Sequence, residues 1–143
     1  MIIFEMFVAF VATLAFAVIF NVNKKELLFC GISGLAAEGA YQIAMELSET
    51  VILSVLISAL VVTSLSRILA NLRKVPVTVY LVSGIIPLVP GAGMYNTVYN
   101  IISSEYSTAL TIGIDTIKIA AVIAIGIIFV FALPNIIFFK LKK

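Results

Sequence analysis

The sequence contains no histidine, a single cysteine and few charges: only 11% of its 143 residues are Asp, Glu, Lys or Arg. Without histidine, the chain cannot assemble a Ser-His-Asp triad, a Cys-His pair or an imidazole metal site. Cys30 alone cannot form an internal disulfide or a zinc cluster. Neither Cys30 nor Ser33 has an evident neighbouring base, which argues against an intramembrane hydrolase. We therefore expect neither an ordinary enzyme nor a bound cofactor.

Apolar residues take the place of the missing charges and make up 63% of the chain. Ordinary soluble domains contain about 25% charged residues and could not hide so much apolar surface. Polar residues divide the chain into five apolar spans, each about the length that a bilayer core requires or longer: 2–20, 27–45, 51–70, 77–102 and 107–137. The connecting segments are short. The sequence therefore predicts an all-α integral membrane protein, with residues 1–143 as one five-span helical bundle.

Charges at the ends of the spans predict the orientation of the chain, because an excess of Lys and Arg marks cytoplasmic loops. We expect the N-terminus outside and the C-terminus in the cytoplasm. A cleaved signal peptide is the competing interpretation of residues 1–20, but this stretch lacks a basic start and carries Glu5. The cations do not follow one face, so no nucleic-acid partner is expected. The basic residues at the ends of the spans are Lys24, Lys25, Arg67, Arg73, Lys74, Lys140, Lys142 and Lys143, and the opposite loops carry Glu46, Glu49 and Glu105.

Two prolines and two glycines interrupt the fourth span, whose residues 85–99 read IIPLVPGAGMYNTVY. Proline removes a backbone donor, and unpaired backbone at membrane depth is tolerated only inside protein or beside a cavity. The pattern predicts a discontinuous fourth helix, broken near 87–93 into halves at 77–86 and 92–102. The free amides at the start of the second half would suit a substrate carboxylate. The candidate binding residues are Pro87, Pro90, Gly91, Ala92, Gly93, Tyr95 and Asn96; the alternative is a simple proline kink.

Glu38 lies near the middle of the second span, where an ionisable side chain is costly. Tyr41 and Gln42 follow it by three and four positions and share its helical face. The rest of this span is rich in Gly, Ala and Ser, which favour close helix packing. One interpretation makes Glu38 a proton or cation site lining a cavity. The other makes it a hydrogen-bonded packing residue or one that faces a partner subunit.

Asp115 and Lys118 are spaced to form an ion pair on one face of the fifth span. The pair could be purely structural, or it could open during transport so that Lys118 meets a substrate carboxylate and Asp115 an amine or a proton. Arg67 is expected to snorkel toward the cytoplasm. Ser54 and Ser58 are expected to pack between helices. Tyr80, Tyr95, Tyr99 and Tyr106 fit interfacial anchors as well as a binding pocket.

The segment PLVPG at 87–91, after an apolar run and before a Tyr- and Asn-containing stretch, resembles the signature of the threonine/serine exporter family, in its shorter C-terminal half. FNV at 20–22, LLFCG at 27–31 and Gly34 are similar to the first loop and second helix of that family. The resemblance carries over only Pro87, Pro90 and Gly91 as motif residues.

The resemblance implies a secondary, proton-driven exporter of small carboxylate metabolites such as threonine, serine or succinate, in a bacterial cell membrane. It also implies a partner, because the short form of the family works with a longer membrane subunit that carries a soluble N-terminal segment. Two alternatives remain for this chain. It could be a structural or assembly subunit whose partner holds the whole substrate path, or a passive channel.

Overall fold

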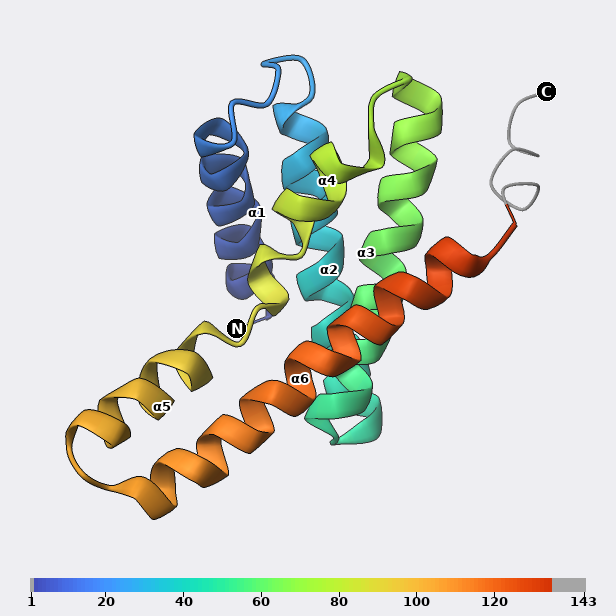
Figure 1. Ribbon diagram of the computed structural model, residues 1–143. Coiled ribbons are helices and arrows are strands. Elements are labelled where there is room, and N and C mark those ends of the chain that lie inside the picture. Colours follow the sequence, from blue (N-terminus) through green and yellow to red (C-terminus); the bar gives the residue numbers. More distant parts are fainter. Residues whose placement is uncertain (1, 135–143) are drawn as a thin grey trace.

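The computed structural model describes residues 2–134 and is built from helices (Figure 1). Four of them are long and apolar enough to cross a membrane, and a bent pair brings the total to as many as five. The all-α fold class and the broken fourth crossing are therefore confirmed. The predicted ends agree with the observed ones within a few residues, except that the predicted end at 137 lies outside the described residues. The elements are α1 (Ile2–Ile19), α2 (Leu27–Ser48), α3 (Val51–Arg73), α4 (Val77–Gly84), the 3-10 turn η1 (Ile86–Leu88), α5 (Gly91–Ile102) and α6 (Tyr106–Ala132).

Left-handed residues end α2 and α3 without the help of glycine. Glu49 has φ of 53° and Lys74 has φ of 54°, and their amides donate to the carbonyls of Met45 and Ala70. This conformation closes each helix end by bonding a carbonyl that would otherwise lack a donor. Only Glu49 and Thr50 separate α2 from α3, so the two helices run antiparallel and pack side by side (Figure 1).

Small residues allow α1, α2 and α4 to pack closely. A Cβ atom added at Gly34 would overlap the side chain of Thr13 on α1, and one added at Gly84 would overlap Ser33 and Val62. Ser58 donates a hydrogen bond across the α2–α3 contact to the carbonyl of Ala37. The expected interhelical packing of the small and hydroxyl side chains is therefore observed at these positions.

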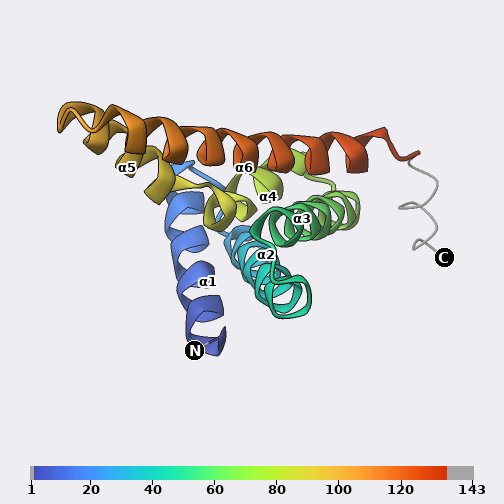
Figure 2. The same cartoon turned by 90° about the horizontal axis from the view of Figure 1, so that it is seen from below.

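Helices α1, α2 and α3 form a row, and α4 and α6 lie across one face of it (Figure 2). The C-terminal half of α6 packs on α3, where Gly126 leaves just enough room for Ala59. Its N-terminal half instead forms a hairpin with α5 that extends away from the row (Figures 1 and 2). The chain therefore consists of a packed bundle and a projecting α5–α6 hairpin.

Arg67 contradicts the expectation that it snorkels. Its side chain is buried, and its guanidinium donates to the carbonyls of Val130 and Leu133 and lies over the ring of Phe131. The last carbonyls of a helix have no donor within that helix. Arg67 satisfies two carbonyls at the end of α6 in this way. Because these carbonyls replace water as hydrogen-bond acceptors, the guanidinium can remain buried.

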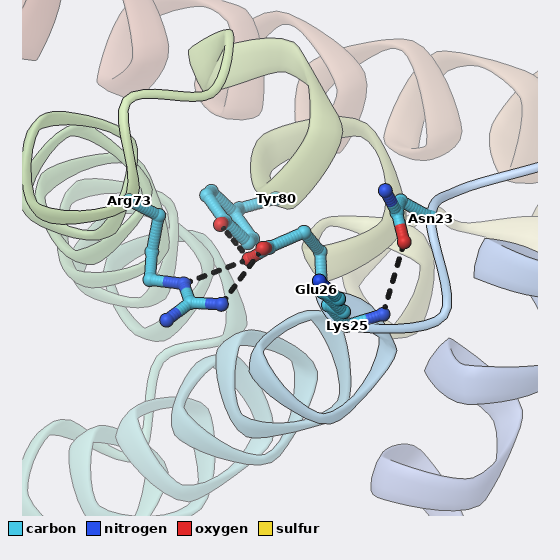
Figure 3. Close-up of polar contacts among 5 residues, drawn as sticks. All are labelled: Asn23, Lys25, Glu26, Arg73 and Tyr80. Carbon is cyan, nitrogen blue, oxygen red and sulfur yellow. Dashed lines mark hydrogen bonds and ion pairs between the residues drawn. The ribbon is translucent and has the colours of Figure 1, made fainter.

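A second polar cluster, in which Glu26 and Tyr80 are buried and Arg73 is exposed, joins the start of α2 to the end of α3 and to α4 (Figure 3). The Glu26 carboxylate accepts hydrogen bonds from Arg73 Nε at 3.1 Å, from Arg73 Nη2 at 2.9 Å and from the Tyr80 hydroxyl at 2.5 Å. The Arg73 guanidinium, helped by the Tyr80 hydroxyl, holds the pKa of Glu26 below its usual value. Tyr80 is fully buried. It is thus neither an interfacial anchor nor part of the candidate site described next.

Candidate functional site at the broken helix

The fourth crossing is interrupted between α4 and α5 by a short irregular segment. The 3-10 turn η1 follows α4 and has Pro87 as its second residue, and Pro90 directly precedes α5. Across the break, the backbone hydrogen bonds are short-range: Leu88 N to Ile85 O at 2.9 Å, Val89 N to Ile86 O at 3.2 Å and Gly91 N to Val89 O at 2.7 Å. The two parts of the crossing are bent by 55° relative to each other. The prolines therefore end one helix, and a new one begins in another direction.

Two cavities lie beside the break. The first has a volume of about 290 Å³ and the second about 350 Å³. Glu38 on α2 and Pro87, the first proline of the break, line both of them, so these two residues lie at the boundary between the two spaces. The first is also lined by Tyr41, Val51, Val55, Leu88, Val89, Pro90 and Ile119, and the second by Phe4, Glu5, Val8, Ala9 and Ala12.

A polar cluster of two carboxylates and one amide lies at this boundary. Gln42 Nε2 donates to Glu38 Oε1 at 2.7 Å, as the shared helical face predicts, and also to Glu5 Oε2 at 2.5 Å. All three side chains are half-buried. The carboxylate oxygens joined by this single nitrogen lie within about 5 Å of each other, a distance at which charged groups influence one another strongly. Sequence reasoning missed Glu5 as a site residue. Its signal was an acidic residue in the first turn of a very apolar span.

A known family matches nearly the whole described chain, including the broken crossing. The model of the family described as "Threonine/Serine exporter, ThrE" matches residues 5–133. The chain belongs to the threonine/serine exporter family. Neither a curated protein nor a solved structure gives a match. Family membership and the long apolar helices together make this a multi-pass membrane protein of a transport family, as the sequence predicted.

The predicted substrate-binding residues divide into two groups in space. Pro87 and Pro90 lie at the cavities, whereas Tyr95 and Asn96 are exposed on α5, which the bend directs away from the bundle (Figure 1). Tyr95 stacks on Tyr99 instead, with ring centroids 6.1 Å apart. The 55° bend is the physical reason for the separation, because it turns α5 toward α6.

The two glycines of the motif region have different surroundings. A Cβ atom added at Gly91 would meet nothing within 4 Å, so this position is open. A Cβ atom at Gly93 would overlap Thr116 of α6, so the absence of a side chain there allows α5 and α6 to pack closely in the hairpin. Ala92 is exposed between them, and the next amide, that of Met94, is bonded to Pro90 O at 3.0 Å. The amides of Ala92 and Gly93 are in the first turn of α5, which supplies them with no acceptor.

The predicted ion pair in the fifth span is present. Lys118 Nζ lies 3.0 Å from Asp115 Oδ1. Their side chains are 56% and 62% exposed, and neither is among the described residues that line the two cavities. Asp115 does precede Ile119, which lines the first cavity, by one helical turn. The structure therefore brings Glu38, Tyr41, Gln42, Pro87 and Pro90 together and leaves the ion pair on the projecting hairpin.

Proposed function

We propose that this chain is a subunit of a secondary exporter of small carboxylate metabolites, of which threonine, serine and succinate are representative. It works in a bacterial cell membrane together with a longer subunit of the same family. The observation that carries the proposal is the meeting of Glu38 with the break at the boundary of two cavities. Interrupted helices at such sites are where secondary transporters bind substrates and coupling ions.

The size of the first cavity fits a small substrate. Its volume of about 290 Å³ lies just below the range for the pockets of drug-sized ligands, about 300–1,000 Å³. The start of α5 adjoins it through Pro90, and the amides of Ala92 and Gly93 carry the positive end of the helix dipole. We propose that the substrate carboxylate binds these amides when the cavity is occupied.

Proton coupling is assigned to Glu38, with Tyr41 and Gln42 as its polar surroundings. Glu38 lines both cavities, so a change in its protonation would change the charge in both of them, on either side of Pro87. Gln42 Nε2 donates to Glu38 Oε1 at 2.7 Å and to Glu5 Oε2 at 2.5 Å, so this amide links the carboxylate on α2 to the one on α1. Proton transfer at Glu38 would rearrange this contact between α1 and α2.

The proposed orientation places the N-terminus outside and the C-terminus in the cytoplasm. Loops 20–26 and 74–76, which carry Lys24, Lys25 and Lys74, lie at the same end of the bundle, and the turn with Glu49 lies at the other end (Figure 1). This arrangement supports the positive-inside assignment. The remaining lysines of that assignment, Lys140, Lys142 and Lys143, lie outside the described residues.

Flux measurements test the proposal. Chain and longer subunit are reconstituted into vesicles, and export of labelled threonine, serine and succinate is followed with and without an imposed pH gradient. We expect gradient-driven flux that Glu38→Gln abolishes while insertion is retained. Normal flux in that variant would refute the coupling role. Replacing Pro90 and Gly91 with Ala should also block transport, and unchanged flux there would reduce the break to a packing feature.

The same preparation separates the alternatives. A passive channel would give flux that ignores the pH gradient. A purely structural subunit would leave flux to the longer partner alone, and Glu38→Gln would then have no effect on transport.

A further inference from the structure

The α5–α6 hairpin is the least buried part of the described chain. Every residue of α5 is at least partly exposed, and in the first half of α6 the buried residue is Ala109. By contrast, the second half of α6 buries Ile123, Gly126 and Val130 against the bundle. The hairpin thus has one covered side, where its two helices meet, and a wide uncovered one (Figure 2).

Much of the uncovered surface is apolar and would suit lipid, but the ion pair would not. Asp115 and Lys118 lie about 14 and 18 Å along α6 from its first residue, at 1.5 Å per residue. α6 has 27 residues and is about 40 Å long, so both charges lie near the middle of a helix that is long and apolar enough to cross a membrane. They are flanked by Ile114 and Ile117, which are 53% and 70% exposed. Charged side chains at this depth almost always face protein or water.

We propose that the face of α6 around Asp115 and Lys118 is the docking surface for the longer subunit of the exporter. This inference rests on the proposed function, which includes that subunit. The pair is neutral as a whole but keeps unused hydrogen-bonding capacity, because Lys118 has two further ammonium protons and Asp115 a second carboxylate oxygen. The partner that fits is a membrane helix presenting both a donor and an acceptor at this depth.

A second copy of this chain fits the same surface less well. Two copies inserted in the same orientation are related by an axis along the membrane normal, and a two-fold contact presents the same patch from both sides. Asp115 would then lie level with its own equivalent, and Lys118 likewise. Such level like charges repel at low dielectric. A non-identical helix has no such restriction, so it can place a donor beside Asp115 and an acceptor beside Lys118.

Crosslinking tests the surface directly. A photoreactive amino acid replaces Ile117 on the proposed face, and the control replaces Ile3 on α1, which is 84% exposed. The full chain is co-expressed with the tagged longer subunit from the same genome, and illuminated membranes are probed for both. We expect one product containing both subunits from position 117 and at least ten times less from position 3. A product of two copies of this chain, or no product above the level of the control, would overturn the proposal.

Charge variants provide a second measurement. Asp115→Lys, which places two cations together, should reduce the longer subunit recovered with this chain at least tenfold, whereas Asp115→Asn with Lys118→Gln should reduce it less. The amount of chain in the membrane is measured in parallel, so that failed insertion is recognised. Unchanged recovery in Asp115→Lys at normal insertion would contradict the docking surface.

Failure of this inference can be told from failure of the proposed function. Glu38→Gln should leave the crosslink from position 117 intact while abolishing flux. If flux is normal in that variant and the crosslink persists, the coupling role fails and the docking surface stands. If wild-type flux is gradient-driven but position 117 does not crosslink to the longer subunit, the docking surface fails and the proposed function stands.

Discussion

Replacing Arg73 with Met should destabilise the bundle by removing the main partner of Glu26. The Glu26 side chain is 9% exposed, while that of Arg73 is 37% exposed, so the pair lies at the edge of the protein interior (Figure 3). Methionine keeps most of the side-chain length, including contact with Phe29, but loses both hydrogen bonds to the carboxylate. Tyr80 then remains as a single donor to Glu26.

The size of the effect follows from these exposures. Breaking a fully buried ion pair costs about 3–5 kcal/mol because one charge is left without compensation. Solvent reaches Arg73, and screening reduces the loss. A cation over an aromatic ring, 4.6 Å from the centroid of Phe29, adds a smaller contribution of about 0.5–1 kcal/mol. We therefore expect Arg73→Met to lower the free energy of unfolding by about 1–3 kcal/mol.

The single cysteine supplies the assay. Cys30 is fully buried and packs in the same cluster as Tyr80, so a thiol-reactive dye should label it only when this end of the bundle opens. Unfolding in mixed detergent micelles is followed by dye fluorescence. Lys74→Met is the matched control, because it removes a neighbouring exposed cation and the same positive charge from the loop. Equal stability of Arg73→Met and Lys74→Met would refute the reasoning.

Three further predictions follow from the packing and the polar clusters. The pKa of Glu26 is lowered in the folded state, so ionised Glu26 stabilises the protein above its ordinary pKa of 4.5, and this stabilisation is lost as the pH falls through the folded pKa. In unfolding measured by circular dichroism, the difference in unfolding free energy between the wild type and Arg73→Met should therefore shrink and disappear below about pH 4.5. A difference that does not change with pH would contradict this prediction. Glu5→Gln should slow gradient-driven flux at least tenfold, while Glu46→Gln, at an exposed position in the last turn of α2, leaves the rate unchanged; equal rates would remove Glu5 from the site. Gly34→Val should lower the free energy of unfolding by about 1–3 kcal/mol, because the added side chain overlaps Thr13. An unfolding curve, measured by Cys30 labelling, that is identical to that of the wild type would contradict this, because it would mean that α1 can move to make room.

Features determined by neighbouring residues could be predicted from the sequence. Long apolar helices, the interruption at the prolines, and the pairs Glu38–Gln42 and Asp115–Lys118 were expected and are observed; four helices can cross a membrane, or five if the bent pair is one crossing. Each depends on hydrophobic length, on proline chemistry or on three- and four-residue helical spacing. The family motif around Pro87 likewise lies in one short segment, and the match over residues 5–133 confirms the family.

Only the tertiary structure decided which helices meet and which faces they turn toward each other. Glu5 reaches Gln42 across 37 positions, and Arg67 reaches the end of α6 across more than 60. The 55° bend removes Tyr95 from the cavity that its position in the sequence suggested. Helical periodicity specifies a face but not the neighbour that covers it, because crossing angles and rotations depend on the small and large side chains of all the helices at once.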